Sequence, residues 1–453
     1  MKKDIKIVNI PSSPAKVRKD LSADSLINMV RNNFKQISDY RKGKTTISLC
    51  DALMSAFAMF SLKDPSLLAF DERRREEGHN LKKIFGIEQI PCDSQMREIV
   101  DNVQPEFIRP AFLSSFRRLQ RGKALESMVF MDGCYLLALD GTGFFSSEKL
   151  SSDACMEKVS KKTGKKTYYI QALAACLVHP DHKEVIPFCP EIIQKQDGET
   201  KNDCERNAAK RFLGKFRKDH PHLKVITIED GLSSNAPHIE ALKAHDMHFI
   251  LGAKPGDHEF LFKYIDQKVD DGTAVEFSLV DEKNPKIEHY FRFINEAPLN
   301  GSNRDLLVNY LEYWETKDDK LKHFSWVTDI TITLENAYQL MRGARTRWKV
   351  ENETFNTLKN QGYHFEHNYG LGSKYLSTNF ILLMMLAFLV DQTQQLCCTL
   401  FQSVWKKLGS KRSLWEQMRG MFQNFKLESM EMLFQALLYG YEKQVPVINF
   451  NSS

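Results

Sequence analysis

The sequence predicts an α/β protein with a mixed sheet, flanked by helical regions at its N- and C-terminal ends. Before about residue 120 and after about residue 377, apolar residues recur with helical spacing. Between these regions, strand-like segments alternate with amphipathic helices, which is typical of an α/β domain. One stretch, 272–332, holds only strand-like segments separated by polar turns. A chain of 453 residues is long enough for two or three folding units.

The N-terminal region, residues 1–125, begins with a basic arm. Residues 1–45 carry 11 Lys and Arg against 4 Asp and Glu. Such an arm often binds polyanions, and it is as often a solvated tail. Helical patterns follow to about residue 120 and are interrupted by prolines. This helical unit is either a DNA-binding module or a packing scaffold, and the lack of a clear helix-turn-helix pattern favours the scaffold.

Residues 126–271 form the first part of the predicted α/β domain. Three strand-like segments follow one another at hairpin spacing and indicate an antiparallel meander: MVFMDGCYLLALDGTGFF, KKTYYIQALAACLVHP and KEVIPFCPEII. An amphipathic helix is predicted from Asp203 to Lys218. The strand KVITIED, the helix APHIEALKAH and the strand MHFILGAK come next. The alternation of strands and helices predicts a sheet covered by helices.

After the β-rich insert at 272–332, residues 333–376 hold one long predicted helix. It begins at Thr333, a suitable N-cap, and runs to Gly362. The last region, 377–453, is helical throughout.

The most apolar run of the chain is FILLMMLAFLV, bounded by Asn379 and Asp391. It is too short to span a bilayer, so we expect a buried helix and no membrane partner.

The composition excludes several classes of protein. Hydrophobic residues make up 42% and charged residues 27%, so the chain is not disordered, collagenous or stapled by disulfides. Lys and Arg exceed Asp and Glu by only 63 to 58, which does not by itself identify a nucleic-acid partner. The lysines at the N-terminus are not followed by an apolar segment, so they do not indicate a secretory signal. The nine cysteines form no C-x-x-C pair, which argues against a zinc site. We therefore expect a cytoplasmic protein with reduced cysteines.

Two aspartates follow apolar strands. Asp140 comes after YLLAL and before Gly-Thr-Gly, and Asp230 comes after KVITIE and before Gly231. A carboxylate at the end of a buried strand, next to glycine, is well placed to face a cleft in an α/β sheet. The alternative for each is a turn-forming aspartate that caps the next element.

A third carboxylate lies in the stretch RWKVE. Arg347 and Glu351 are four residues apart and therefore share a face of the predicted helix. Phe355 and Leu358 continue this face, which we expect to pack inward. The alternative is a structural salt bridge.

The order of these pieces resembles the ribonuclease H-like catalytic domain of DDE transposases, of the insertion-sequence type with a β-rich insert before the last carboxylate. The resemblance covers roughly residues 135–368. The late signature of that group is Tyr-x2-Arg-x3-Glu-x6-Lys. Arg347 and Glu351 match it, whereas Ala344 stands at the tyrosine position and Leu358 at the lysine position, with Lys359 one residue later.

Lys359 is a weaker match than Arg347, because eight residues on an ideal α-helix place it about 80° from the face of Glu351. Glu353 is a rival third carboxylate, since it lies six residues before Lys359, but it has no arginine four residues before it.

The resemblance implies a fold, an activity and a set of roles. It implies a ribonuclease H-like mixed sheet in which Asp140, Asp230 and Glu351 hold two Mg²⁺ ions, or Mn²⁺ ions, with Asp140 bridging them. The activity implied is hydrolysis of DNA at the ends of a mobile element, followed by strand transfer to target DNA. Arg347 would hold a phosphate near the cut, and Lys359 could add a further positive charge.

Other residues are candidates for DNA contact. Lys161, Lys162 and Lys165 cluster at a hairpin tip, which suits a DNA backbone and equally suits a solvated turn. Trp326 lies in the β-rich insert, where transposases of this type can stack an aromatic side chain on a flipped base; the alternative is a core residue. The histidines of HPDH, residues 179–182, are most simply part of a polar turn.

The expected partners are double-stranded DNA with terminal inverted repeats and a second protomer, which the helices after residue 377 are candidates to contact. The expected location is the bacterial cytoplasm, in association with the nucleoid when the protein acts. Two other functions remain open: a non-catalytic DNA-binding protein derived from a transposase, and a metal-dependent nuclease of the same fold that does not join strands.

Overall fold

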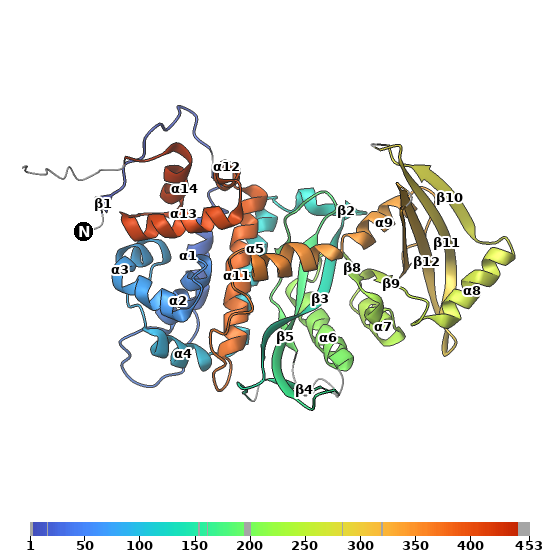
Figure 1. Cartoon of the computed structure of the whole chain (residues 1–453), viewed down its shortest axis with the longest axis horizontal. Helices are drawn as coiled ribbons and strands as arrows, with labels where there is room; N and C mark the ends of the chain where they lie inside the picture. The colour runs from blue at the N-terminus through green and yellow to red at the C-terminus, as the bar shows by residue number, and fades with distance from the viewer. Residues whose placement is uncertain are drawn as a thin grey trace, which may run out of the picture. The chain divides into compact units, whose positions relative to one another are not determined.

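The structure, a computed structural model, divides the chain into two compact units (Figure 1). The helical unit consists of residues 1–124 and 358–453, and the sheet unit consists of residues 125–357. The residues that the structure describes are 3–15, 17–152, 155–160, 162–193, 201–282, 284–318 and 320–442.

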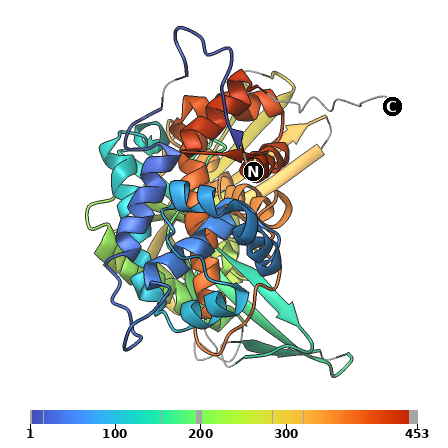
Figure 2. The same ribbon diagram turned by 90° about the vertical axis from the view of Figure 1, so that its left-hand side faces the viewer.

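The helical unit joins the two ends of the chain. Its N-terminal part supplies α1 (Ala23–Phe34), α2 (Leu49–Ser61), α3 (Leu67–Phe85), α4 (Asp93–Asp101), η1 (Pro105–Phe107) and α5 (Arg109–Arg121). Its C-terminal part supplies α11 (Leu376–Cys397), α12 (Thr399–Leu408), α13 (Lys411–Asn424) and α14 (Met430–Tyr439). Figure 2 shows the N-terminal helices, in blue, beside the C-terminal helices, in orange and red. Where the sequence predicts two separate helical regions, the structure has one unit, because α11 packs against α1, α2, α4 and α5.

Short strands also tie the two ends together. Strand β1 (Lys3–Asp4) pairs in parallel with β14 (Phe425–Lys426). All nine cysteines of the chain are free thiols, as the sequence predicts.

Helix α11 contains the apolar run that the sequence singles out. It is longer than the run itself, because the helix continues past Asp391 to Cys397. Among the described helices of at least 18 residues, α11 is the one long and apolar enough to cross a membrane, so the expectation based on a short run was wrong about its length. Its most apolar window is 83% buried inside the protein, as in the core helix of a folded domain.

The sheet unit is built on a mixed sheet. Its first strands are β2 (Val129–Met131), β3 (Cys134–Ser147), β4 (Met156–Val159), β5 (Lys166–Val178), β6 (Ile186–Pro187), β7 (Glu191–Ile193), β8 (Val225–Glu229) and β9 (His248–Gly252). Strand β3 is antiparallel to β5 and parallel to β8, and β8 is parallel to β9. Helices α6 (Lys201–Asp219) and α7 (Ala236–Ala244) connect the parallel strands. The predicted ribonuclease H-like mixed sheet is confirmed.

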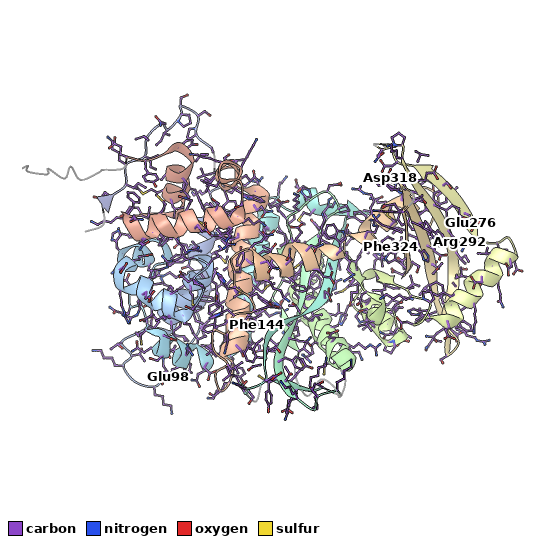
Figure 3. The ribbon with its side chains drawn as sticks, in the orientation of Figure 1. Glu98, Phe144, Glu276, Arg292, Asp318 and Phe324 are labelled. Atoms are coloured by element: carbon purple, nitrogen blue, oxygen red, sulfur yellow. The ribbon has the colours of Figure 1, made fainter. Side chains whose placement is uncertain are left out.

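The β-rich insert extends this sheet. After α8 (Glu259–Asp270) come β10 (Val275–Val280), β11 (Ile287–Asn300), β12 (Asn303–Lys317) and β13 (Lys320–Thr328). They pair as antiparallel neighbours, and β13 pairs with β9, so the strand order among the described residues is β10-β11-β12-β13-β9-β8-β3-β5-β4. On one face of the insert, Arg292 Nε donates to Glu276 Oε1 at 2.6 Å across neighbouring strands (Figure 3).

The long helix predicted from Thr333 to Gly362 is broken. It comprises α9 (Ala337–Arg345), an irregular turn, the π-helix η5 (Val350–Phe355) and α10 (Asn356–Asn360). Thr333 caps the turn before α9 rather than the helix itself: its Oγ1 accepts from the backbone N of Asn336 at 3.3 Å, and Asn336 Oδ1 accepts from the backbone N of Thr333 at 2.9 Å. A uniform 3.6-residue pattern does not distinguish an α-helix from one that contains a π turn.

Candidate active site

Asp140 and Asp230 lie side by side on neighbouring parallel strands. In the register of β3 and β8, Ala138 is opposite Ile228, and each aspartate comes two residues later. Side chains two residues apart on a strand point to the same face, and paired strands are about 4.8 Å apart. Both aspartates line one small cavity of about 40 Å³. The two aspartates therefore lie next to each other at this edge of the parallel pairing.

The two aspartates differ in their local backbone. The sequence suggests that Asp140 ends its strand. In the structure β3 continues past Asp140 to Ser147 in its pairing with β5. Asp230 does end β8, and its Oδ1 accepts from the backbone N of Leu232 at 3.0 Å. Gly252 of β9 leaves room for this turn, since a Cβ there would lie 3.1 Å from the backbone N of Gly231.

Arg347 connects Asp140 to Glu351. Its Nη1 is 3.3 Å from Asp140 Oδ2 and 3.9 Å from Glu351 Oε1. Because both distances are measured from the same nitrogen, Asp140 Oδ2 and Glu351 Oε1 cannot be further apart than the sum of the two. The pair Arg347–Glu351 therefore includes the strand aspartate as a third partner.

The pKa of Asp140 reports on the whole group. Burial is the largest cause and raises this pKa, Arg347 lowers it, and the negative charges of Glu351 and Asp230 raise it further, so that the pKa reaches about 7. Two carboxylates from two other segments therefore act electrostatically on Asp140. A carboxyl whose pKa is perturbed in this way at a cavity is typical of a functional site.

The segment that carries Glu351 packs tightly on the sheet. Val350 and Thr354 are fully buried, and Thr354 Oγ1 lies 3.4 Å from Cys176 Sγ of β5. The Glu351 side chain itself remains 55% exposed. The carboxylate is thus presented to solvent from a backbone that is fixed by packing.

The π-helix changes the spacing argument for Lys359. A π turn closes with i→i+5 hydrogen bonds and so contains one residue more than an α turn. Eight residues from Glu351 to Lys359 through η5 therefore correspond to seven on an α-helix, which is the spacing of the family signature. The 80° offset expected for an ideal helix does not apply. Lys359 lies in the helical unit, where its Nζ is 2.8 Å from Glu366 Oε1.

Glu353 lies in a different environment from Glu351. Its charge acts on Lys349, whose Nζ binds backbone carbonyls in the turn after β5. The Asp140 carboxyl is perturbed by Glu351 instead. The geometry therefore favours Glu351 as the third carboxylate.

Sequence reasoning gave too little weight to three residues at the cavity. Glu205 of α6 lines it, and a Cβ on Gly141 would lie only 3.0 Å from Glu205 Oε1. Glu229 accepts from Ser233 Oγ at 2.6 Å and is bonded to His238 Nε2 at 2.7 Å. Burial lowers the pKa of His238, but Glu229 outweighs it and the pKa is raised. No motif marks this pair, which is brought together by the fold of η4 (Gly231–Ser233) and α7.

The remaining candidates are spread over the sheet unit. Lys162 and Lys165 are exposed at the hairpin between β4 and β5, and Lys165 Nζ is 3.3 Å from Glu148 Oε2. Lys161 lies outside the described residues. Trp326 is only 7% exposed, and its ring stacks on Phe324 at a centroid distance of 5.8 Å. This packing matches the core alternative, and a base-stacking role for Trp326 stays a prediction.

The carboxylates suit a hard cation in their chemistry. Asp140, Asp230 and Glu351 offer oxygen donors, which Mg²⁺ and Mn²⁺ prefer. In the part of the chain that the structure describes, no three His, Cys, Asp or Glu side chains stand close enough together to hold a metal ion. Burial and the negative charges of Glu351 and Asp230 raise the pKa of Asp140, and a bound cation would offset this effect, so the carboxylates fit a cation. In this structure the positive charge near Asp140 and Glu351 is that of Arg347.

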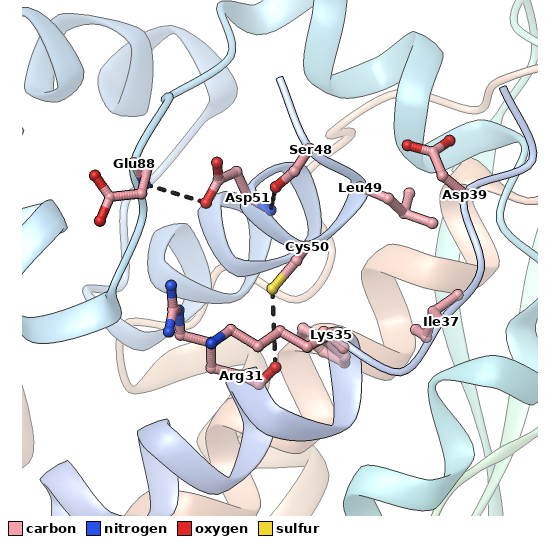
Figure 4. Close-up of a pocket in the computed structure, with 10 residues that line it drawn as sticks. Arg31, Lys35, Ile37, Asp39, Ser48, Leu49, Cys50, Asp51 and Glu88 are labelled. Carbon is pink, nitrogen blue, oxygen red and sulfur yellow. Dashed lines mark hydrogen bonds between the residues drawn. The ribbon is translucent and has the colours of Figure 1, made fainter. Parts of the chain in front are cut away.

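The helical unit has a larger hollow of about 450 Å³ (Figure 4). Its polar groups bind one another. Asp51 accepts from the backbone N of Glu88 at 3.1 Å, and Cys50 Sγ lies 3.8 Å from the carbonyl oxygen of Arg31. These contacts hold α2 against α1 and against the segment after α3. The carboxylate cavity, and not this hollow, is therefore the candidate active site.

Comparison with known proteins decides the family. The family model for the transposase DDE domain matches residues 135–389, more than half of the chain. This chain belongs to the DDE transposase family. No curated protein matches it. Among solved structures, one similar chain comes from a cryo-EM structure of a piggyBac transposase synaptic complex with hairpin DNA, with 11% identity and a TM-score of 0.39. That likeness covers 97% of this chain and 86% of the other.

The transposase is thus an enzyme that acts on DNA, and DDE transposases generally use divalent metal ions. The matched region begins one residue after the start of β3 and includes Asp140, Asp230 and Glu351.

The raised pKa of Asp140 predicts how the metal-free transposase responds to pH. The folded pKa of about 7 exceeds the usual 3.8, so the native state binds more protons between these values. Its stability should therefore fall as pH rises from about 4 to about 7, by roughly 1–3 kcal/mol from this group. Urea unfolding in EDTA at about pH 5 and pH 8 measures the difference. In Asp140→Asn this contribution should vanish; an unchanged pH dependence would show that Asp140 titrates normally.

Proposed function

We propose that Asp140, Asp230 and Glu351 are the catalytic carboxylates with which this transposase cuts and joins the ends of a mobile DNA element. One observation carries the proposal: Asp140 and Asp230 line one small cavity, and Arg347 Nη1 lies 3.3 Å from Asp140 Oδ2 and 3.9 Å from Glu351 Oε1. The charges of Asp230 and Glu351 also raise the pKa of the partly buried Asp140 carboxyl. A structural salt bridge needs only one acid, whereas here two further acids act on the carboxyl that Arg347 contacts.

The metal we propose is Mg²⁺, with Mn²⁺ as an alternative. Asp140, Asp230 and Glu351 would hold it, since their oxygens are hard ligands. When bound, it would activate a hydroxyl nucleophile and stabilise the charge on the leaving oxygen of the phosphodiester. Asp140, between the other two acids, would contribute to every ion bound there.

Arg347 and Lys359 would bind the DNA backbone. The guanidinium has five N–H donors in a planar fork and can bind phosphate in two places, so Arg347 is suited to orient the phosphate that is cut. The contact of Arg347 Nη1 with Asp140 places this fork next to the reacting carboxylates. Lys359 would add a further point charge for the DNA backbone. Lys161, Lys162 and Lys165 would contact the backbone further along the DNA.

The substrate we propose is double-stranded DNA that ends in terminal inverted repeats, bound by two protomers at once. Two ends must be held together for joint insertion, which suits a homodimer. We place the protein in the bacterial cytoplasm, at the nucleoid when it acts, where its nine free thiols would remain reduced.

The test is cleavage and joining by the purified protein. DNA that carries the element's own ends is incubated with the full chain and Mg²⁺ or Mn²⁺, and a plasmid serves as target. Nicked ends and strand-transfer products are expected. Nicking without any joined product would indicate a nuclease, and binding without nicking would indicate a DNA-binding protein.

A pair of variants identifies the third carboxylate. Glu351→Gln should lower the rate of end cleavage by about 100-fold or more, because it removes a charge that acts on Asp140. Glu353→Gln, the same change two residues away, should stay within about threefold of wild type, since its charge acts on Lys349. Single-turnover cleavage of a labelled end measures both. The opposite ranking would transfer the role to Glu353.

A further inference from the structure

Lys349 is buried beside the catalytic segment and is not part of the family signature. It precedes Glu351 by two residues and is only 8% exposed. Its Nζ donates to the carbonyl oxygens of His179 at 2.5 Å and Pro180 at 3.0 Å, and also to that of His182. A lysine ammonium has three N–H donors, so these carbonyls use its whole capacity.

The three carbonyls belong to the turn that follows β5. This strand pairs with β3 through Ala174, which is opposite Asp140. The turn is itself held by other contacts: His182 Nε2 is 2.9 Å from the carbonyl oxygen of Ser127, and Arg342 Nη2 is 2.5 Å from Asp181 Oδ1. Lys349 therefore fastens its segment to the strand that lies next to Asp140.

The fastened segment is one in which regular helical hydrogen bonding is interrupted. Thr346 and Arg347 form a turn between α9 and the helix that follows, and η5 begins at Val350. Glu351 is more than half exposed, and its contact with Arg347 is long. Its backbone is held on one side by Lys349 and on the other by the buried Thr354, three residues later.

We propose that Lys349 is a positioning residue that sets the place of Glu351 relative to Asp140 and thereby the affinity of the site for a divalent cation. The inference rests on the proposed catalytic role of Glu351. Lys349 would touch neither DNA nor metal. A merely structural lysine would change the stability of the sheet unit without changing the response to metal.

Charged side chains surround Lys349, so a replacement that removes its ammonium group tests whether this group is needed. Glu353, Asp181 and Glu184 place negative charges around it, and Arg342 a positive one. Lys349→Met keeps roughly the length of the side chain and removes all three N–H donors. Lys349→Gln keeps an N–H donor but no charge. Lys183 lies in the same turn and is exposed, so Lys183→Met is a matched control for the loss of a positive charge.

Two measurements are made on the full chain. The first is the Mn²⁺ concentration that gives half-maximal end cleavage, together with the KM for end DNA. The second needs no activity: the rise in thermal midpoint when Mn²⁺ is added to protein without DNA. Lys349→Met should raise the half-maximal Mn²⁺ concentration about tenfold or more and reduce the rise in midpoint, with the KM for DNA changed less than about twofold. Lys349→Gln should fall between, and Lys183→Met should match wild type.

The outcomes separate this inference from the proposed function. If Lys349→Met responds to Mn²⁺ as wild type does while Asp140→Asn is inactive, the positioning role is wrong and the catalytic assignment stands. If Asp140→Asn is fully active, the proposed catalytic role of the carboxylates is wrong, and the positioning role of Lys349 loses its basis with it. If Lys349→Met does not fold, Lys349→Gln decides: a wild-type response to Mn²⁺ overturns the inference.

Discussion

Asp140→Asn should abolish both end cleavage and strand transfer, with a loss on the order of 1,000-fold or more. The substitution keeps the shape of the side chain but removes the charge that lies between Asp230, Glu351 and Arg347. Gel assays of end cleavage and of joining to a plasmid measure the two steps. Both should fail together, because one site is proposed to perform both.

The control for this loss is Asp132→Asn. Asp132 is an exposed residue in the β2–β3 turn with φ of 51°, a conformation that asparagine tolerates well. Asp132→Asn should therefore keep full activity. Asp140→Asn should still bind end DNA and should be at least as stable as wild type above pH 7, since it removes a buried charge. Retained cleavage in Asp140→Asn would remove the basis for the carboxylate site.

Asp101→Ala should destabilise the helical unit by about 3 kcal/mol or more, the largest stability effect that we expect. Asp101 ends α4, is only 7% exposed, and accepts at 2.7–3.0 Å from donors at the start of α11: the backbone N and Oγ of Ser373 and the backbone N of Lys374, Tyr375 and Leu376. These donors would lose a charged partner at a helix N-terminus. The expected fall in thermal midpoint is about 2–4 °C for each kcal/mol.

The matched control is Asp93→Ala in the same helix. Asp93 pairs with Arg97 at the surface at 2.6 Å, and such exposed pairs are worth about 0.5 kcal/mol. Burial raises the pKa of Asp101, but hydrogen bonds from Ser373, Lys374 and Leu376 outweigh it, so the pKa is lowered. The contribution of Asp101 is therefore present above its unfolded pKa near 3.8 and is lost as pH falls through the lower folded pKa. Equal effects of the two alanine variants would show that Asp101 does not hold α11.

Much of the catalytic domain was predictable because its signals are local. The apolar segments before Asp140 and Asp230 can be read from the sequence, although β3 continues past Asp140. Each aspartate lies two residues after a residue of the β3–β8 pair Ala138–Ile228, so both side chains point to one face. Arg347 and Glu351, four residues apart, share a helix face through a periodicity that the sequence also shows. The four strands of the insert follow from their alternation and from the polar turns between them.

Other features depend on contacts between distant residues. The sequence did not show that η5 is a π-helix, since one extra residue in a turn leaves the apolar pattern almost unchanged. It could not choose between Glu351 and Glu353, because the choice depends on which of them lies near Asp140, which is more than 200 residues earlier in the chain. No sequence pattern connects Lys349 with the turn after β5, because His179 in that turn lies 170 residues away in the chain.

The sequence by itself indicated the family, the order of the elements and the two candidate aspartates, because strand periodicity, helix periodicity and short motifs are properties of neighbouring residues. Only the tertiary structure decided that the two helical ends of the chain form one unit and that the insert continues the central sheet through β13 and β9. It also decided that Asp140 is the partly buried acid whose pKa is raised by burial and by the charges of the other two acids. Burial and electrostatic interaction depend on distances through space, and these are set by packing between segments that lie up to 436 residues apart in the chain.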